Sequence, residues 1–394
     1  MLDPVRDASI GVDPPQLTLT RTGAGDETVD SGAQSQQSFL VENALQQKEA
    51  VPVEGLMFVS TDSFQFFASV CVGKVRGNVA HRAKKRPMRL PSPVVSSTIS
   101  RMNEQSVAEQ VVEKRTLVGE GVLWDPQDKV IYWVDILSHE LYIYDPATGS
   151  NRTIPTCQAV GTVVKRAAGG LVLALHNGFA FLDLDTEKIT PVADPERDIP
   201  TNRFNDGKCD PAGRFWAGTM EFGGAPDAGA LYCLDTDHTV TEKLRPVTIS
   251  NGIVWTADAR TMYYICTAAN TVRAFDYDID TGAISNERVV VTNEGEGGFD
   301  GMAIDAEDKL WVAVFGGWGV RRYDPETGAL LSEVRLPIAQ VTACAFGGEN
   351  LDELYITSAA VGLDDDALTA QPLAGSLVKV DPGVVGVAAC SYRG

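Results

Sequence analysis

From residue 120 onward, the chain repeats one pattern of apolar and polar positions. A short apolar run is followed by a polar turn, such as Asp-Pro-Gln-Asp or Asp-Pro-Ala-Gly, and then by a second run rich in Val, Ile, Tyr and Trp. Turn residues between two runs enriched in β-branched and aromatic residues are typical of a β-hairpin. The pattern therefore predicts a succession of hairpins through residues 120–394.

Six copies of this pattern align without gaps as sixteen-residue segments. They are Glu120–Asp135, Gly161–His176, Asn205–Met220, Asn251–Cys266, Asp300–Phe315 and Cys344–Ala359. Their first residues are 41 to 49 positions apart, and further strand signals allow about four strands per unit. A four-stranded unit of roughly 40 to 50 residues is the size of one propeller blade. We therefore predict an all-β fold, a six-bladed β-propeller, because a pair of β-sandwiches would not explain six ungapped copies.

Residues 1–102 are predicted to be an extension outside the propeller, which would occupy residues 103–394. No strand or helix period persists through this part, and residues 63–101 include eight basic and no acidic side chains. Three interpretations stay open: a disordered tail, an organelle-targeting piece, or non-native upstream sequence included by choosing too early a start codon. Met102 suits the last of these because it leads directly into the first repeat.

Composition and charge narrow the class of protein. The 394 residues are 44% hydrophobic and 22% charged, as in a soluble globular protein. The formal net charge is −20, and residues 103–394 alone carry −21, which would repel nucleic-acid phosphates and anionic lipid headgroups. We therefore expect no nucleic acid and no membrane as partner, and a monomer or a small homo-oligomer.

The cysteines indicate a compartment rather than a site. Seven cysteines are scattered along the chain without a C-x-x-C pair, so neither a disulfide framework nor a zinc cluster is suggested. The most apolar early stretch, residues 56–75, is interrupted by polar residues and does not begin the chain as a secretory signal would. We expect a cytoplasmic protein.

The first residues of the six copies should lie near one entrance of the channel, because the innermost strand of every blade lines it. These positions form a predicted ring of Glu120, Gly161, Asn205, Asn251, Asp300 and Cys344. Carboxylates are costly to bury unless they are paired or bound to a metal. Oxygen ligands favour a hard cation such as calcium, magnesium or manganese. The alternative is that Asn-Gly and Asp-Gly here are ordinary turn dipeptides.

Several strings within the repeats resemble those of a known family. The longest is Arg203–Met220, which reads RFNDGKCDPAGRFWAGTM, and shorter ones begin at Gly119, Ile249, Phe299 and Gly316. Over about residues 115–394, the chain resembles the regucalcin and gluconolactonase family of six-bladed propellers.

The resemblance implies one divalent metal ion held by Glu120, Asn251 and Asp300. The identity of the metal is left open among Ca, Zn, Mg, Mn and Fe. The implied activity is metal-dependent hydrolysis of sugar-acid lactones, of the gluconolactone, xylonolactone or arabinonolactone type, to aldonic acids. The partner would be a small-molecule sugar lactone, and Asp300 could also take the proton from the attacking water as a general base.

The resemblance also implies the residues that bind the substrate. Arg203 and Asn205 would contact the lactone, and Glu221, which follows the Gly-Thr-Met element, is the candidate for binding sugar hydroxyls. Two other functions stay open: a calcium-binding regulatory protein without turnover, and a hydrolase of organophosphates or other esters. Arg203 and Asn205 favour catalysis, because calcium binding needs neither.

Overall fold

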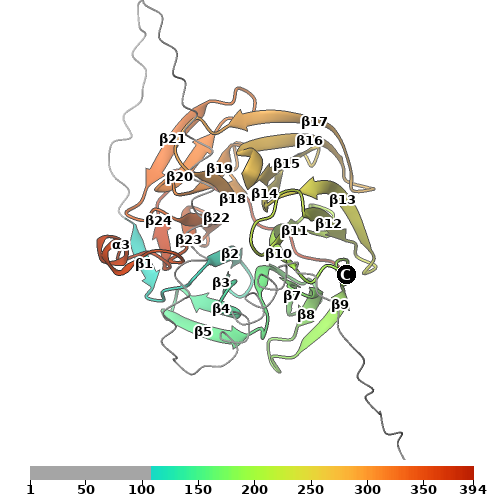
Figure 1. Ribbon diagram of the computed structural model, residues 1–394, viewed down its shortest axis with the longest axis horizontal. Helices are drawn as coiled ribbons and strands as arrows, with labels where there is room; N and C mark the ends of the chain where they lie inside the picture. The colour runs from blue at the N-terminus through green and yellow to red at the C-terminus, as the bar shows by residue number, and fades with distance from the viewer. Residues whose placement is uncertain (1–107) are drawn as a thin grey trace, which may run out of the picture. The chain divides into compact units, whose positions relative to one another are not determined.

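The computed structural model describes residues 108–394. These residues fold into six four-stranded antiparallel sheets, which surround a central channel as blades (Figure 1). The prediction of a six-bladed β-propeller is confirmed. The predicted extension, residues 1–102, lies outside the described residues. In the described part of the chain, no helix has the length and apolar character needed to span a membrane.

Each blade runs from an innermost strand at the channel to an outermost strand at the rim, and blades are numbered here from the one that contains β2. The innermost strands are β2 (Gly119–Asp125), β6 (Val160–Lys165), β10 (Asn202–Cys209), β14 (Ser250–Trp255), β18 (Gly298–Ile304) and β22 (Val341–Gly347). The second strands are β3 (Val130–Asp135), β7 (Leu171–Leu175), β11 (Phe215–Glu221), β15 (Thr261–Cys266), β19 (Leu310–Phe315) and β23 (Glu353–Ser358). The third strands are β4 (Glu140–Asp145), β8 (Gly178–Leu182), β12 (Gly229–Leu234), β16 (Thr271–Asp278), β20 (Gly319–Tyr323) and β24 (Leu377–Val380). The outermost strands are β5 (Ser150–Pro155), β9 (Ile189–Ala193), β13 (Val240–Val247), β17 (Ala283–Thr292), β21 (Leu330–Arg335) and β1 (Glu109–Val112).

The first described strand closes the ring of blades. β1 pairs in antiparallel orientation with β24, so that Glu109 lies opposite Lys379 and Gln110 opposite Val378. The last blade therefore takes three strands from the end of the chain and one from residues that precede blade 1 (Figure 1). Helical structure within residues 108–394 is limited to the short η1 (Thr267–Ala269) and α3 (Asp365–Ala370).

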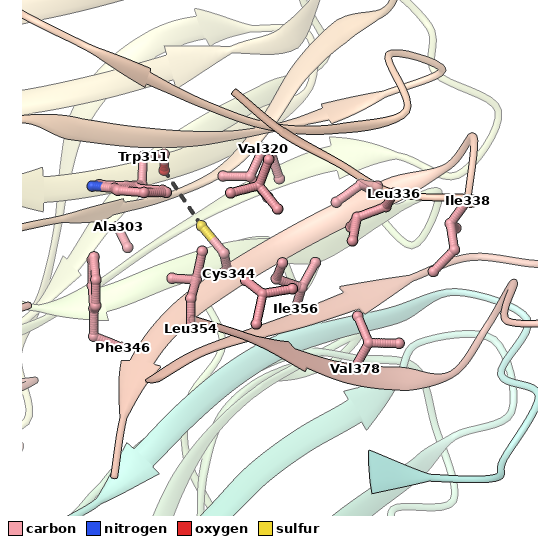
Figure 2. Close-up of a cluster of buried hydrophobic side chains, with 14 of the residues drawn as sticks. Ala303, Trp311, Val320, Leu336, Ile338, Cys344, Phe346, Leu354, Ile356 and Val378 are labelled. Atoms are coloured by element: carbon pink, nitrogen blue, oxygen red, sulfur yellow. Dashed lines mark hydrogen bonds between the residues drawn. The ribbon is translucent and has the colours of Figure 1, made fainter. Parts of the chain in front are cut away.

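The hydrophobic core is divided among the interfaces between blades. Six clusters of buried apolar side chains occur in the described residues, and each joins two neighbouring blades. Figure 2 shows the cluster between blades 5 and 6, with Trp311 and Val320 from one blade facing Leu354 and Ile356 from the other. Because both faces of a blade are covered by its neighbours, no blade can bury its apolar residues alone.

Every innermost strand carries one extra residue relative to its second strand. In blade 3, for example, Phe204 lies opposite Thr219 and Gly207 opposite Ala217. The same register shift occurs in the other five blades. Such a β-bulge interrupts the alternation of side chains between the two faces and re-aims the residues within it. The bulges therefore decide which side chains enter the channel.

The structure corrects the sixth position of the predicted ring. The bulge of β22 lies between Val341 and Ala343, so Thr342 rather than Cys344 corresponds to Asp300 of β18. Cys344 is instead buried in the cluster between blades 5 and 6, where its Sγ donates a 3.4 Å hydrogen bond to the main-chain oxygen of Trp311 (Figure 2). The ungapped alignment was two residues out of register here, because the bulge begins earlier in β22.

The segment that follows β24 crosses the opposite end of the channel. The main-chain N–H of Tyr392 donates to the main-chain oxygen of Lys165 in blade 2. Its hydroxyl donates to the main-chain oxygen of Asp235 in blade 3. Ala389 and Cys390 of this segment line a cavity of about 40 Å³ in the channel, together with residues of blades 1, 2, 3 and 6. That volume holds a few water molecules at most, so a sugar-sized molecule does not fit into this cavity.

Candidate active site

Four side chains of the predicted ring meet at the other end of the channel. Glu120, Asn205, Asn251 and Asp300 lie in or directly beside the bulges of β2, β10, β14 and β18. All four are buried, with between 4% and 7% of their surface exposed. Gly161 occupies the corresponding bulge of β6 and adds no side chain. The local cause of this gathering is the extra residue in each innermost strand, which turns polar side chains toward the axis.

A chain of hydrogen bonds runs from the Arg203 guanidinium through the two amides, Asn205 and Asn251. Arg203 Nη1 donates to Asn205 Oδ1 at 2.7 Å and to the main-chain oxygen of Phe204 at 3.0 Å. Asn205 Nδ2 donates to the main-chain oxygen of Ser250 at 2.7 Å and to Asn251 Oδ1 at 3.2 Å. Asn205, predicted to contact substrate, is therefore in direct contact with the predicted metal ligand Asn251, and Arg203 is linked to that ligand through Asn205.

The two ring carboxylates lie in an environment that disfavours their negative charge. Burial, followed by the nearby charge of Asp206, raises the pKa of Glu120 to about 8. Burial, followed by the charge of Glu120, raises the pKa of Asp300 well above its usual value. Asp300 Oδ1 is buried without a hydrogen-bond partner. A buried carboxylate with a free lone pair is unfavourable by itself and calls for a positive charge.

Asp206 is a third buried carboxylate that the sequence interpretation missed. Its Oδ1 accepts a 2.7 Å hydrogen bond from the N–H of Gly207, and its Oδ2 has no hydrogen-bond partner. Burial raises the pKa of Asp206, while the positive charge of Lys208 opposes the shift. Strict alternation along a strand would place Asp206 on the face opposite Asn205, and only the bulge brings both to the channel. The signal that could have found it is the Asn-Asp-Gly string itself.

The donor set at this end of the channel suits a divalent cation. Glu120 and Asp300 supply anionic oxygens, Asn251 supplies an amide oxygen, and the unpartnered Asp300 Oδ1 provides a vacant lone pair. Within residues 108–394, no three His, Cys, Asp or Glu side chains form a group that could hold a metal ion, and Asn251 as the third ligand stays a prediction. All-oxygen sets of this kind are the preference of hard cations.

Arg203 brings a positive charge beside these carboxylates. Burial lowers the pKa of its guanidinium to about 10, and the charges of Glu120 and Asp300 oppose that shift, so the group stays charged at neutral pH. Its Nε is buried without a partner, and the guanidinium lies 5.8 Å from the ring centre of the half-exposed Phe222. Arg203 therefore retains a donor for a ligand that enters from this side.

Glu221 lies at the end of β11, the strand that pairs with the innermost strand β10 of the same blade. Its Oε2 accepts hydrogen bonds from the N–H groups of Gly223 at 2.7 Å and Ala225 at 3.1 Å. In the structure this carboxylate fastens the loop that carries Phe222. Its contact with sugar hydroxyls stays a prediction.

The fold and the site define a class: a six-bladed propeller whose channel carries a buried, oxygen-rich polar site at one end. Comparison with known proteins then identifies the family. Residues 118–360, more than half of the chain, match the model of the SMP-30/Gluconolactonase/LRE-like region. The chain belongs to this family.

The match to relatives of known name spans nearly the whole length of those relatives. Regucalcin of Danio rerio is 46% identical over 290 residues, which are 73% of this chain and 98% of the relative. Among solved structures, a calcium-binding protein, regucalcin, from Agrobacterium tumefaciens is 31% identical with a TM-score of 0.70, covering 73% of this chain and 98% of that one. A luciferin-regenerating enzyme is 35% identical with a TM-score of 0.69, covering 73% and 99%.

Proposed function

We propose that this protein hydrolyses sugar-acid lactones with the help of one divalent cation held by Glu120, Asn251 and Asp300. The observation that carries the proposal is the buried carboxylate of Asp300, whose Oδ1 lacks a hydrogen-bond partner beside the equally buried Glu120. Arg203 and Asn205 lie next to this pair and turn a metal-binding site into one that can also hold a polyhydroxylated ester. Membership of a family described by the name of gluconolactonase supports this proposal.

The residues divide the chemistry of lactone hydrolysis between them. A bound divalent cation supplies a Lewis acid for the lactone carbonyl and lowers the pKa of an adjacent water. The carboxylate of Asp300, which would also hold the cation, takes the proton of the water that attacks the carbonyl carbon. The ring C–O bond then breaks, and the proton passes to the departing alkoxide. Arg203 holds the ring oxygen or the new carboxylate through donors that the protein leaves unused.

A calcium-binding protein without turnover is the second candidate. The solved Agrobacterium tumefaciens relative is described as a calcium-binding protein, and the all-oxygen donor set suits calcium. The buried Arg203 argues against storage alone, because placing a guanidinium near a cation site weakens cation binding. The identity of the metal stays open among Ca, Zn, Mg, Mn and Fe, and the experiment below determines it.

We further propose that the protein works in the cytoplasm. All six cysteines among the described residues are free thiols, and four of them are buried. Unpaired cysteines of this number suit a reducing compartment.

The test compares lactone hydrolysis by the full chain with that of an arginine variant. Metal-free protein, reloaded with each divalent ion in turn, is assayed by pH-stat against gluconolactone, xylonolactone and arabinonolactone. We expect hydrolysis to return with at least one ion. Arg203→Ala should keep the metal yet lose kcat/KM by at least about tenfold, which is ~1.4 kcal/mol of transition-state stabilisation.

Arg152→Ala is the matched control, because it removes an arginine from an exposed rim pair with Glu187. It should hydrolyse lactones at the wild-type rate. Equal rates in Arg203→Ala and wild type would refute the role of Arg203. Metal binding without hydrolysis of any lactone above the spontaneous rate would establish the calcium-binding alternative instead.

A further inference from the structure

One buried hydroxyl touches both of the strands that carry the neighbouring predicted ligands Asn251 and Asp300. Thr267, the first residue of η1, is 8% exposed. Its Oγ1 accepts a 2.7 Å hydrogen bond from Asn251 Nδ2 and donates a 2.8 Å hydrogen bond to the main-chain oxygen of Phe299. Phe299 directly precedes Asp300, so a single side chain contacts one predicted ligand and the backbone of the residue before the other.

The direction of these hydrogen bonds is determined by chemistry. At one end of the chain stands Arg203, which can only donate, and at the other stands the carbonyl of Phe299, which can only accept. Between them, Asn205, Asn251 and Thr267 must each accept on one side and donate on the other. The amide of Asn251 therefore turns its Nδ2 to Thr267 and its Oδ1 to Asn205 Nδ2, on the side of the other ring residues.

That orientation matters because only the oxygen of an amide can ligate a cation. If the hydroxyl of Thr267 were absent, Asn251 Nδ2 would be a buried donor without an acceptor. Rotation of the amide would not help, since it would point Nδ2 at Asn205 Nδ2, a second donor. Thr267 itself is held by its main chain, because its N–H donates to the carbonyl of Ile249, so the hydroxyl has a defined place.

We propose that the Thr267 hydroxyl is the positioning group of the metal site: it orients the Asn251 amide and anchors the strand that presents Asp300. The inference rests on the proposed function, because it takes Asn251 and Asp300 as metal ligands. Partners that orient the ligands of a metal typically contribute about 10- to 100-fold in affinity. The Thr267 hydroxyl is engaged by Asn251 and by the carbonyl of Phe299, so its effect should reach catalysis through the metal.

The experiment measures metal affinity of the full-length protein without lactone, by titration calorimetry with the chloride salts of calcium, magnesium, manganese, zinc and, without oxygen, iron(II). Thr267→Val keeps the shape of the side chain and removes the hydroxyl, and it should weaken binding by about 10- to 100-fold. Thr267→Ser keeps the hydroxyl and should bind within about threefold of wild type. Thr267→Ala is measured beside them, since it has room to relax if valine disturbs folding.

Thr162→Val is the matched control. Thr162 is also a buried threonine whose hydroxyl donates to a carbonyl of the neighbouring blade, that of Gly207, but it contacts neither Asn251 nor Phe299. It should bind metal within about threefold of wild type. Wild-type affinity in both Thr267→Val and Thr267→Ala would overturn the inference, as would an equal loss in Thr162→Val. If the wild type binds none of the five candidate metals, the proposed function fails first, and the inference fails with it.

Discussion

At the scale of single residues, a buried carboxyl of the site lowers the folding stability of the metal-free protein. Asp300 is buried without a partner for Oδ1, whereas Asp305, five residues later in the same blade, is buried but accepts hydrogen bonds from Trp311 Nε1 at 2.9 Å and Arg322 Nε at 2.7 Å. A buried carboxylate that is fully paired supports the fold, and one without partners costs free energy. The contrast indicates a structural role for Asp305 and supports the functional role that we propose for Asp300.

The isosteric change Asp300→Asn should have opposite effects on stability and on metal binding. In chelated protein it removes a buried carboxyl whose ionisation is opposed by burial and by the charge of Glu120, so the melting temperature should stay the same or rise. Added metal should raise the melting temperature of the wild type by mass action and leave that of Asp300→Asn unchanged. Differential scanning calorimetry with and without metal measures both.

Asp305→Asn is the control, because it breaks a charged pair with Arg322. We expect it to lower stability by about 3 kcal/mol and to keep the metal-induced rise in melting temperature. A metal-induced rise in Asp300→Asn as large as in the wild type would exclude Asp300 as a ligand.

At the scale of elements, the segment after β24 joins blades that are not neighbours in sequence. Tyr392 is fully buried in the cluster between blades 2 and 3, and Gly386 pairs with Asp305 of blade 5. This segment lies at the end of the channel opposite the site, so it should contribute to stability rather than to catalysis.

Replacing Tyr392 tests this. Tyr392→Ala removes a buried aromatic ring and should cost about 3–5 kcal/mol, as other aromatic-to-alanine changes in cores do. Tyr392→Phe loses only the hydroxyl hydrogen bond to Asp235 and should cost about 0.5–1.5 kcal/mol. Urea unfolding followed by circular dichroism measures both. Equal stability of the two variants would show that the segment is not part of the folded core.

At the scale of the whole molecule, stability depends on closing the ring. β1 supplies the outermost strand of blade 6, and Val112 of β1 belongs to the cluster between blades 6 and 1. The chain needed for folding should therefore begin before Glu109, which agrees with our proposed boundary at residue 103.

Two truncated chains test that boundary. A chain that begins at Met102 contains all 24 described strands and should melt, bind metal and hydrolyse lactone like the full chain. A chain that begins at Lys114 lacks β1, exposes the edge of β24 and should melt at a lower temperature. Loss of solubility or activity in the chain from Met102, with the full chain active, would place part of residues 1–101 within the fold.

The sequence by itself determined the features that come from its local repeats, namely the hairpins and the number of blades. Alternating apolar runs and polar turns specify a hairpin wherever they occur, and six copies at even spacing specify the number of blades. The same repetition placed Glu120, Asn205, Asn251 and Asp300 in one column, and the structure brings these four side chains together.

Only the tertiary structure decided the register within each innermost strand. A β-bulge arises from how one strand pairs with the next and with the neighbouring blade, and nothing in the local pattern of apolar residues marks its position. For that reason Asp206 enters the channel, Thr342 takes the place expected for Cys344, and the hydroxyl of Thr267 reaches from one blade to the next. These contacts join residues far apart in sequence, so they exist only once the ring of blades has closed.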